Sequence, residues 1–345
     1  MKKRSIPAIV FLDVENAWEK AYLRKRLPSE KVLIFLDSPT KAVEEKIKNT
    51  EILSVFIKSK INTQFLRSFP KLQFITTRST GFDHIDLKAC KKRGIVVSNV
   101  PVYGENTVAE HTFALILSLS RNLRKAYLRT VQNNFSIEGL MGFDLKGKTL
   151  GIVGTGYIGL HVIRMGIGFG MKVIAFDVKQ NQFLAEVLGF EYVSFEDLLK
   201  NSDIISLHTP YLPATKHLIN KESIKRIKKG AILINTARGG LIETDALVEA
   251  LDRGVIAGAG LDVLENEEFI LEEKRLISDQ KNTKHWSKIK TVLKNHALLH
   301  RENVVYTPHM AFYSKEAVER ILDTTVSNIK AFVGSASINQ VNYDS

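Results

Sequence analysis

Residues 150–159, LGIVGTGYIG, constrain the fold of this chain more than any other part of its sequence. Gly154, Gly156 and Gly159 have the spacing G-x-G-x-x-G, follow an apolar strand-like run and precede a helical segment. The spacing alone is a weak signal, but between a strand and a helix it permits a tight turn and close approach of a ligand to the helix N-terminus. The pattern predicts the first strand, turn and helix of a doubly wound α/β domain.

A second strand-like run, KVIAFD, follows the glycine pattern and ends at Asp177. In dinucleotide-binding folds an acid at this place accepts hydrogen bonds from ribose hydroxyls, while the glycine turn receives the pyrophosphate. The carboxylate of Asp177 repels a 2′-phosphate and so favours NAD over NADP, a preference that the nearby Lys179 weakens. We therefore predict an NAD site at the glycine turn and Asp177.

Two series of strand-like runs alternate with amphipathic segments along the chain. Five β-branched runs lie within about the first 100 residues, and six more begin at Lys148 and end near His309. Strands that alternate with helices indicate parallel sheets covered by helices. A chain of 345 residues also exceeds the size at which a single hydrophobic core usually stops growing. We expect an α/β protein with two domains.

The connections between these series carry helical patterns. One long helix is expected over residues 105–132, where Thr107 and Glu110 have capping-box spacing and apolar positions run nearly all round, as between two domains. Residues 263–301 are rich in Lys and Glu and are interpreted as a helical excursion without a strand. Residues 314–333 are predicted to form the last amphipathic helix. If this helix packs on the first domain, that domain contains both chain ends.

Composition excludes several classes of protein. Hydrophobic residues make up 44% and charged residues 25% of the chain, as in ordinary globular proteins. The longest apolar stretch, FALILSLS, is far shorter than the ~20 residues that span a bilayer. Cys90 is the only cysteine, which rules out an intrachain disulfide and the usual thiolate metal site. No metal and no membrane partner are expected.

The charge pattern bears on location and partners. Asp13 and Glu15 interrupt the apolar run after the basic N-terminus before a signal-peptide core is complete, which favours a cytoplasmic protein. The net charge of +12 raises the possibility of nucleic-acid binding. The Lys and Arg residues are instead spread along amphipathic segments, and no nucleic-acid-binding motif accompanies them. Nucleic acid is therefore not expected as a partner.

Polar side chains gather at the predicted carboxyl ends of strands in the second series, where ligands of open α/β sheets bind. Arg238 follows one strand in INTARGG, and His309 follows another in TPHMAFYS. A third segment, GLDVLENEEF, carries Asp262 and then Glu265 and Glu267. Each has an ordinary alternative: Arg238 could form a surface ion pair, Glu267 could belong to an acidic run, and His309 could be a packed core residue. Together they make a plausible catalytic group.

These motifs resemble those of the D-isomer-specific 2-hydroxyacid dehydrogenase family, and its lactate branch in particular. The resemblance rests on STGFDHIDLKACKKRGIVVSNVP, NTVAEHTFALILSLSRN, LGIVGTGYIG, DIISLHTP, INTARGGLIETDALVEAL, GLDV followed by ENEE, and TPHMAFYS. It implies two doubly wound parallel-sheet domains. A Rossmann NAD-binding domain, residues 103–307, would be inserted into a flavodoxin-like substrate-binding domain of residues 1–102 and 308–345. The first 60 residues and residues 268–302 match only in general character.

The resemblance implies that Arg238, Glu267 and His309 are the catalytic residues. Glu265 is the close competitor of Glu267, which we prefer because its separation from Arg238 matches the lactate branch. The aromatic residues after His309 resemble that branch too. In the proposed reaction His309 exchanges a proton with the C2 oxygen of a 2-oxo or 2-hydroxy acid while hydride passes between C2 and NAD. Glu267 stabilises the imidazolium, and Arg238 binds the substrate carboxylate and polarises the carbonyl.

The resemblance also implies ligand contacts and an assembly. It implies a homodimer formed through helices of the nucleotide domain. The substrate would contact Arg238, Tyr103 and the loop of Ser79, Thr80 and Gly81, whose amides suit a carboxylate. The implied NAD contacts are Gly154, Gly156, Tyr157, Ile158, Gly159, Asp177, Thr209, Pro210, Thr215, Thr236, Ala237, Arg238 and Asp262.

Two alternatives remain open. Reduction of pyruvate to D-lactate is favoured, but loop shape could instead suit 2-oxoisocaproate, phenylpyruvate, hydroxypyruvate or glyoxylate. The other alternative is an NAD-sensing corepressor or scaffold of the same fold. The intact Arg, Glu and His favour an enzyme.

Overall fold

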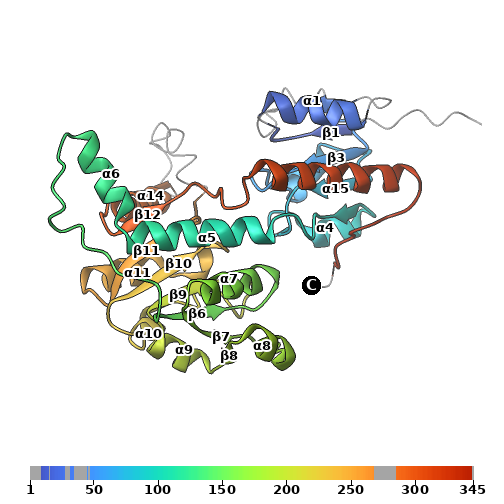
Figure 1. Ribbon diagram of the computed structural model, residues 1–345. Coiled ribbons are helices and arrows are strands. Elements are labelled where there is room, and N and C mark those ends of the chain that lie inside the picture. Colours follow the sequence, from blue (N-terminus) through green and yellow to red (C-terminus); the bar gives the residue numbers. More distant parts are fainter. Residues whose placement is uncertain are drawn as a thin grey trace, which may run out of the picture. The chain divides into compact units, whose positions relative to one another are not determined.

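The computed structural model describes residues 9–14, 16–27, 32–34, 45, 47–267 and 285–343. It divides into two compact units, Met1–Gly104 with Ser314–Ser345 and Glu105–Tyr313 (Figure 1). We call them the first and the second unit. Each contains one parallel sheet, which confirms the predicted pair of α/β sheets.

The sheet of the first unit has the strand order β2-β1-β3-β4-β5, which is the flavodoxin-like order. Strands β1, β3 and β4 lie inside the sheet and are buried along their whole length, as expected of a parallel sheet that is covered on both faces. All five predicted runs form strands. They are β1 (Ile9–Phe11), β2 (Val32–Ile34), β3 (Ile52–Val55), β4 (Phe74–Thr77) and β5 (Val96–Ser98).

Polar side chains cap helices of the first unit. A carboxylate oxygen of Asp86 accepts a hydrogen bond from the N–H of Ala89 at 3.0 Å, and the hydroxyl of Ser314 accepts one from the N–H of Ala317 at 3.2 Å. Such caps satisfy backbone donors that a helix start leaves without partners. The helices are α1 (Ala17–Arg26), α3 (Thr63–Arg67), α4 (Leu87–Lys92) and α15 (Lys315–Val333).

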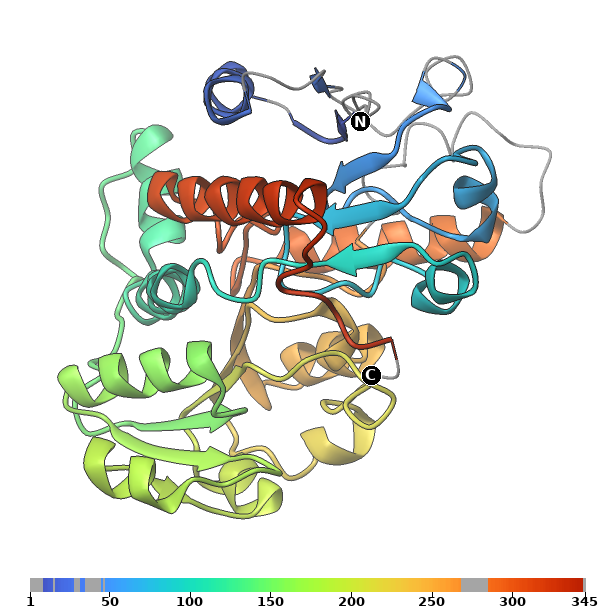
Figure 2. The same cartoon turned by 90° about the vertical axis from the view of Figure 1, so that its right-hand side faces the viewer.

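The C-terminal helix α15 packs on the first unit, against β4 and α1 (Figure 2). The rings of Phe74 and Phe332 stack with their centroids 4.5 Å apart. Beyond the helix, the N–H of Val341 donates to the carbonyl of Val97 in β5 at 3.0 Å. The first unit therefore contains both ends of the chain, as expected if the last helix packs back.

The sheet of the second unit has the order β12-β11-β10-β9-β6-β7-β8. With β6 counted first, this is the Rossmann order extended by one strand. All six predicted runs form strands, and β8 is additional because its two residues are too short to show a periodicity. The strands are β6 (Thr149–Val153), β7 (Lys172–Phe176), β8 (Glu191–Tyr192), β9 (Ile204–Leu207), β10 (Ala231–Asn235), β11 (Ile256–Leu261) and β12 (Val304–Tyr306).

Helices cover both faces of this sheet. In β10, Leu233 joins the hydrophobic core of one face, whereas Ile232 and Ile234 join the core of the other. A sheet buried on both faces explains the almost continuously apolar strands. The helices are α5 (Glu105–Ser120), α6 (Leu123–Val131), α7 (Tyr157–Gly168), α8 (Gln182–Leu188), α9 (Phe195–Asn201), α10 (Lys221–Ile224), α11 (Thr244–Asp252) and α14 (His285–Leu299).

The prediction of one helix over residues 105–132 is wrong, because the chain forms α5 and α6 with a break between them. Asn122 has a left-handed backbone with φ of 52°. The carbonyl of Ser120 instead accepts a hydrogen bond from the N–H of Phe143 at 2.9 Å. A Cβ added at Gly142 would lie 2.2 Å from that carbonyl, so only glycine lets the returning chain approach.

Helix α5 begins at Glu105, where the predicted helix begins. The capping-box reading of Thr107 is wrong, because Thr107 is a buried residue of the first turn and not an N-cap. The polar segment after Val263 contains α14 in its described part, while residues 268–284 lie outside the described residues. In the part of the chain that the structure describes, no helix combines the length and apolarity needed to cross a membrane.

Candidate active site

The glycine turn between β6 and α7 has the geometry of a phosphate-binding turn. Gly154 has φ of +100°, and a Cβ there would lie 2.8 Å from the carbonyl oxygen of His208. A Cβ at Gly159 would lie 2.0 Å from the carbonyl oxygen of Gly154, which shows how closely α7 approaches the turn. A Cβ at Gly156 meets nothing within 4 Å. The open side of Gly156, at the N-terminus of α7, fits the pyrophosphate of a dinucleotide.

Asp177, just past β7, lies beside this turn. Its Oδ2 accepts hydrogen bonds from the backbone N–H and the hydroxyl of Thr155, at 2.7 and 3.1 Å. Its Oδ1 accepts one from the N–H of Lys179 at 2.8 Å. The hydroxyl of Tyr192 lies 2.9 Å from that of Thr155. Sequence reasoning missed Thr155 and Tyr192, which hold the half-buried carboxylate toward the glycine turn, where it fits a ribose.

The loop after β9 adds two polar groups. The hydroxyl of Thr215 donates to the carbonyl of Pro210 at 2.6 Å and accepts from the N–H of Leu212 at 2.8 Å, which closes the loop. The hydroxyl of Thr209 is buried without a hydrogen-bond partner among the described residues. Thr209 also lies against Gly154, with its Cγ2 3.0 Å from an added Cβ. An orphaned buried hydroxyl at the glycine turn is consistent with a ligand there.

His208, which directly follows β9, is a further group that sequence reasoning missed. Its Nε2 lies 2.8 Å from the hydroxyl of Ser206. Burial lowers the pKa of His208 to about 3, so its imidazole is neutral at physiological pH. The backbone carbonyl of His208 packs against Gly154, while its neutral ring contributes no positive charge to the phosphate-binding turn.

Asn235 at the end of β10 shapes the turn that carries Arg238. Its side chain accepts a hydrogen bond from the N–H of Ala237 at 3.0 Å and donates one to the carbonyl of Arg238 at 2.9 Å. The hydroxyl of Thr236 lies 3.0 Å from that of Thr112 in α5. These bonds fix the backbone of three predicted NAD contacts, while the half-buried guanidinium of Arg238 donates to the carbonyl of Ala237 at 2.9 Å.

Asp262 holds the turn that carries His309. The buried carboxylate accepts hydrogen bonds from the hydroxyl of Thr307 at 2.5 Å and from the N–H groups of Met310 and Ala311, both at 2.9 Å. Its backbone carbonyl accepts the N–H of His309 at 2.8 Å. His309 has φ of 52°, a conformation that costs energy outside glycine and needs such support. Both carboxylate oxygens of Asp262 therefore accept hydrogen bonds from the turn that carries His309.

This turn also determines where the second unit ends. Because Asp262 binds the backbone of residues 309–311, these residues stay with the second unit, which extends to Tyr313. The boundary expected from the sequence lay earlier, between residues 307 and 308. His111 of α5, not predicted, contributes to the turn with its Nε2 2.9 Å from the hydroxyl of Thr307.

His309 is paired with Glu267. Its Nδ1 lies 2.6 Å from Oε1 of Glu267, and both side chains are half-buried. The other predicted candidate, Glu265, contacts a different histidine, with its Oε1 2.6 Å from Nε2 of His217. The structure therefore brings Glu267 and not Glu265 to His309. A histidine that a carboxylate holds through one nitrogen can exchange a proton at the other.

The residues predicted to bind substrate in the first unit form a polar loop after β4. The hydroxyl of Ser79 donates to the carbonyl of Gly81 at 2.6 Å, and the hydroxyl of Thr80 donates to the carbonyl of Val100 at 2.9 Å. The backbone N–H groups of Ser79, Thr80 and Gly81 donate no hydrogen bond to described residues. Three adjacent amide donors can receive an anionic group. Tyr103 lies farther along, and its carbonyl accepts a hydrogen bond from Arg320.

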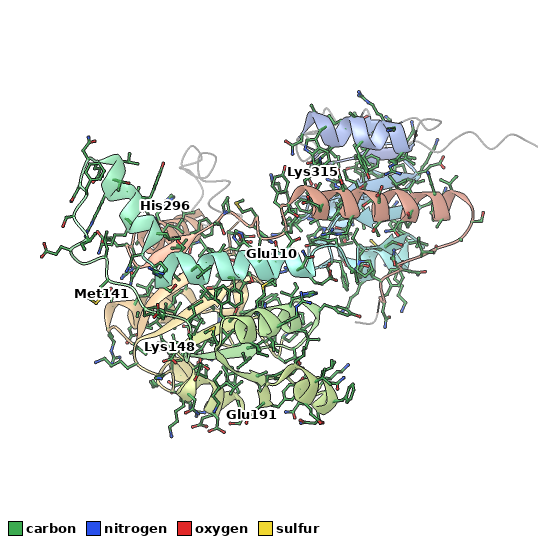
Figure 3. The ribbon with its side chains drawn as sticks, viewed as in Figure 1. Glu110, Met141, Lys148, Glu191, His296 and Lys315 are labelled. Atoms are coloured by element: carbon green, nitrogen blue, oxygen red, sulfur yellow. The ribbon has the colours of Figure 1, made fainter. Side chains whose placement is uncertain are left out.

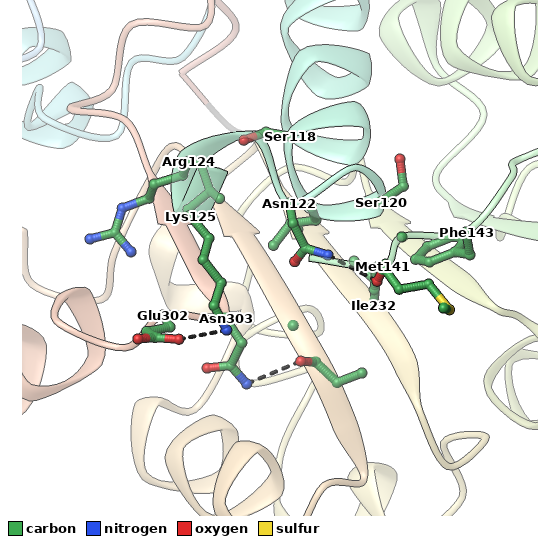
Figure 4. A pocket seen from close by; sticks show the side chains of 15 residues that line it. Ser118, Ser120, Asn122, Arg124, Lys125, Met141, Phe143, Ile232, Glu302 and Asn303 are labelled. Carbon is green, nitrogen blue, oxygen red and sulfur yellow. Dashed lines mark hydrogen bonds and ion pairs between the residues drawn. The ribbon is translucent and has the colours of Figure 1, made fainter. Parts of the chain in front are cut away.

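A cavity of about 200 Å³ lies elsewhere in the second unit, where β10, β11 and β12 begin (Figure 4). At its wall Lys125 and Glu302 form an ion pair of 2.8 Å, and Asn303 donates to the carbonyl of Ala257 at 3.0 Å. None of the predicted site residues lines it. Ligands of such sheets bind at the opposite, carboxyl ends of the strands, so this cavity is not the candidate active site. Among the described residues there is also no group of three potential metal ligands.

Known proteins are similar in sequence to most of this chain. A family described as D-isomer specific 2-hydroxyacid dehydrogenase, NAD binding domain, matches residues 113–311. D-lactate dehydrogenase of Escherichia coli (strain K12) is 37% identical over 295 residues, which cover 84% of this chain and 85% of that protein. An aromatic 2-oxoacid reductase of Clostridium sporogenes is 41% identical over 265 residues, or 76% of each protein.

A solved structure shares the fold. D-lactate dehydrogenase from Aquifex aeolicus, determined in complex with NAD and lactic acid, superposes with a TM-score of 0.83 at 41% sequence identity. The match covers 95% of this chain and 96% of that one. Together with the glycine turn and the strand-end residues, these relationships show that the chain belongs to the D-isomer specific 2-hydroxyacid dehydrogenase family and is an NAD-dependent oxidoreductase.

Proposed function

We propose that the protein reduces a small 2-oxo acid, with pyruvate as the preferred substrate and D-lactate as the product. The observation that carries the proposal is the pair of His309 and Glu267, whose Nδ1 and Oε1 atoms lie 2.6 Å apart. This pair follows strands of the same sheet that carries the glycine turn after β6. A proton-transferring group and a dinucleotide site in one sheet suit a hydride and proton transfer.

Residues of the second unit would hold NADH, which supplies the hydride. The N-terminus of α7 and the open side of Gly156 would bind the pyrophosphate, and Asp177 the ribose hydroxyls. The orphaned hydroxyl of Thr209 would gain a partner. The remaining proposed contacts are Gly154, Tyr157, Ile158, Gly159, Pro210, Thr215, Thr236, Ala237, Arg238 and Asp262.

His309 would donate a proton to the carbonyl oxygen of the substrate from Nε2 during reduction and accept it there during oxidation. Glu267 stabilises the imidazolium and fixes the ring through Nδ1. Arg238 binds the carboxylate of the substrate and polarises its carbonyl, a role that suits the fixed donor geometry of a guanidinium. The proposed substrate contacts in the first unit are the amides of Ser79, Thr80 and Gly81, and Tyr103.

Two observations favour pyruvate. D-lactate dehydrogenases occur among both the sequence relatives and the similar structures. Phe312 and Tyr313, whose rings meet edge to face at 5.7 Å, follow His309 as in the lactate branch. A larger 2-oxo acid is the second candidate, because an aromatic 2-oxoacid reductase is also among the relatives.

The test is steady-state oxidation of NADH by the purified chain with pyruvate, 2-oxoisocaproate, phenylpyruvate, hydroxypyruvate and glyoxylate, followed by chiral analysis of the product. We expect the highest kcat/KM with pyruvate and D-lactate as the product. A higher kcat/KM with another 2-oxo acid would make that acid, and not pyruvate, the proposed substrate. NADH binding without turnover of any of them would instead support an NAD-sensing scaffold.

We also propose that the protein is a homodimer. Helix α6 has no buried residue and projects from the second unit (Figure 1). Large apolar side chains are exposed along it and along the returning chain, where Met141 is 93% exposed (Figure 3). An exposed apolar strip of this kind marks an interface, and a second copy is its simplest partner. The strip contains Leu123, Tyr127, Leu128, Val131, Phe135, Ile137 and Met141.

Light scattering coupled to size-exclusion chromatography tests the assembly. We expect twice the mass of one chain for the wild type and the mass of one chain for Tyr127→Asp combined with Phe135→Asp. Val187→Asp is the matched control, because Val187 is an equally exposed apolar residue on α8 outside the strip. A monomeric wild type, or a dimer that survives the double substitution, would contradict the proposal.

A further inference from the structure

A second histidine and glutamate pair lies on the turn that carries Glu267. Nε2 of His217 lies 2.6 Å from Oε1 of Glu265, and both side chains are about a quarter to a third exposed. We propose that this pair positions Glu267 against His309 by clamping residues 264–267. The inference rests on the proposed function and makes Glu265 and His217 positioning residues, without contact to the reacting atoms.

Glu265 connects the turn to separate parts of the second unit. Its Oε2 accepts hydrogen bonds from the hydroxyl and the backbone N–H of Thr244, at 3.1 and 3.4 Å, where α11 begins. Its backbone carbonyl accepts a hydrogen bond from Nδ2 of Asn295 in α14 at 3.2 Å. With His217 from the loop before α10, three segments that are distant in sequence hold one residue.

The turn itself transmits the position of Glu265 to Glu267. The N–H of Glu267 donates to the carbonyl of Leu264 at 3.3 Å, and the N–H of Leu264 donates to Oε2 of Glu267 at 3.2 Å. Asn266 between the two acids has a left-handed backbone with φ of 55°. In this short closed turn the two carboxylates face different histidines, so a shift of one displaces the other.

Close packing on the other side of the turn leaves little room for adjustment. A Cβ added at Gly239 would lie 2.0 Å from the carbonyl atoms of Leu264 and 2.5 Å from the nitrogen of Glu265. Gly239 directly follows Arg238, so the loops after β10 and β11 are in contact. When the clamp is released, the turn can therefore move only away from this contact, and Glu267 moves with it.

The expected consequence is electrostatic. A carboxylate at 2.6 Å stabilises the imidazolium of His309, and this attraction weakens as the distance grows and water enters. Loss of the clamp should therefore move the alkaline limb of the pH profile of kcat for reduction to lower pH, so that kcat falls by about tenfold at a pH above that limb. Affinity for NADH should change by less than about twofold, because no clamp residue lies at the glycine turn.

The test compares Glu265→Ala with Glu265→Gln in the full chain. NMR titration of the His309 imidazole gives its protonation midpoint, and the pH profile of kcat gives the catalytic effect. Glu265→Ala should move the midpoint to lower pH. Glu265→Gln keeps hydrogen-bonding groups for His217 and Thr244. Its midpoint should therefore stay closer to that of the wild type than the midpoint of Glu265→Ala. A midpoint that stays in place in Glu265→Ala while only the melting temperature falls would overturn the clamp.

A double-substitution cycle adds a readout that general destabilisation would not give. In a Glu267→Gln background the clamp has no carboxylate to position, so Glu265→Ala should have little further effect on kcat. An equal effect in both backgrounds would overturn the inference. Asp245→Asn is the control, because the 2.6 Å ion pair of Asp245 and Lys294 joins α11 to α14 without touching the turn.

The clamp and the proposed function are contradicted by different results. If no 2-oxo acid is reduced, the proposed function fails, and the NMR midpoint of His309 still tests the clamp. If turnover is normal but the midpoint does not respond to Glu265→Ala, only the clamp fails. If Glu265→Ala does not fold, His217→Ala replaces it, because that variant leaves the bonds of Thr244 and Asn295 in place. The protonation midpoint of His309 is then measured in His217→Ala.

Discussion

Nδ1 of His309 lies 2.6 Å from Oε1 of Glu267, and this contact decides which nitrogen of the ring serves the substrate. Because Glu267 engages Nδ1, a proton can be exchanged only at Nε2. The backbone of His309 is left-handed, with φ of 52°, and Asp262 binds it through its carbonyl. Ring and backbone are thus both fixed, as expected for a group that must meet one substrate atom.

Substitution His309→Gln should reduce turnover of the best 2-oxo acid by about 10²-fold or more, since the proton donor is lost. Affinity for NADH should remain nearly unchanged, because the ring lies outside the glycine turn. Steady-state kinetics and fluorescence titration with NADH measure the two effects. His300→Gln, an exposed histidine at the end of α14, is the control. Near-normal turnover in a folded His309→Gln protein would remove His309 from the mechanism.

Substitution Glu267→Gln should shift the pH optimum of pyruvate reduction to lower values. The neutral amide no longer stabilises the imidazolium, so a lower pH is needed to keep the proton donor charged. Rate profiles between about pH 5 and 9 show the shift. The same substitution at Glu265 should leave the optimum closer to that of the wild type, because its carboxylate faces His217. A shift seen only in the Glu265 variant would reverse the assignment.

The strands of both sheets and the glycine turn could be predicted from the sequence because they depend on local patterns. β-branched runs and glycine spacing specify a strand or a turn within a few residues. The break at Asn122 could not be predicted in this way, since it depends on Gly142 returning to the carbonyl of Ser120. Strand β8 was not predicted, because two residues are too few to show a periodic pattern.

Residue type and strand ends were enough to single out Arg238 and His309 as candidates, but not the groups that hold them. Glu265 and Glu267 lie on one turn and differ only in the histidine that each faces, which is a tertiary relationship. Asn235 looks in sequence like an ordinary strand residue. Its role appears only when its bonds to the turn after β10 are seen.

Substitution Asp177→Ala should relax the discrimination against NADPH. It removes the charge that repels a 2′-phosphate and the acceptor of the ribose hydroxyls, so KM for NADH should rise while that for NADPH falls. The ratio of kcat/KM for the two cofactors measures the change. Glu191→Ala removes an exposed carboxylate from the same domain and serves as the control. An unchanged ratio in Asp177→Ala would exclude the ribose role.

The pH dependence of stability should contain a contribution from His208. Its pKa is about 3 in the folded protein and about 6.5 in an unfolded chain, so only the unfolded chain takes up a proton between these values. The free energy of unfolding should therefore fall as pH decreases below about 6.5, by up to about 1.4 kcal/mol per pH unit. Urea denaturation at a series of pH values measures this free energy for the wild type and for His208→Asn. The free energy of unfolding should decrease less steeply with falling pH in the variant. Parallel slopes would contradict this contribution.

Substitution Asp262→Asn should loosen the turn of His309 before it affects the cofactor. Both carboxylate oxygens accept hydrogen bonds from residues 307–311, and an amide nitrogen would leave a buried N–H of Met310 or Ala311 without an acceptor. An unsatisfied buried donor costs about 1 to 3 kcal/mol, so the free energy of unfolding should fall by that amount. With the histidine less well placed, kcat should fall as well.

Affinity for NADH distinguishes the two roles open to Asp262. If its carboxylate serves the turn, the Kd for NADH of Asp262→Asn should stay within about twofold of the wild type while kcat falls about tenfold or more, since a displaced proton donor weakens catalysis and not cofactor binding. A Kd that rises as much as kcat falls would assign the carboxylate a direct contact with the cofactor. Asp252→Asn, which weakens the partly exposed ion pair with Arg301 at 2.8 Å, controls for the loss of one negative charge in the same unit.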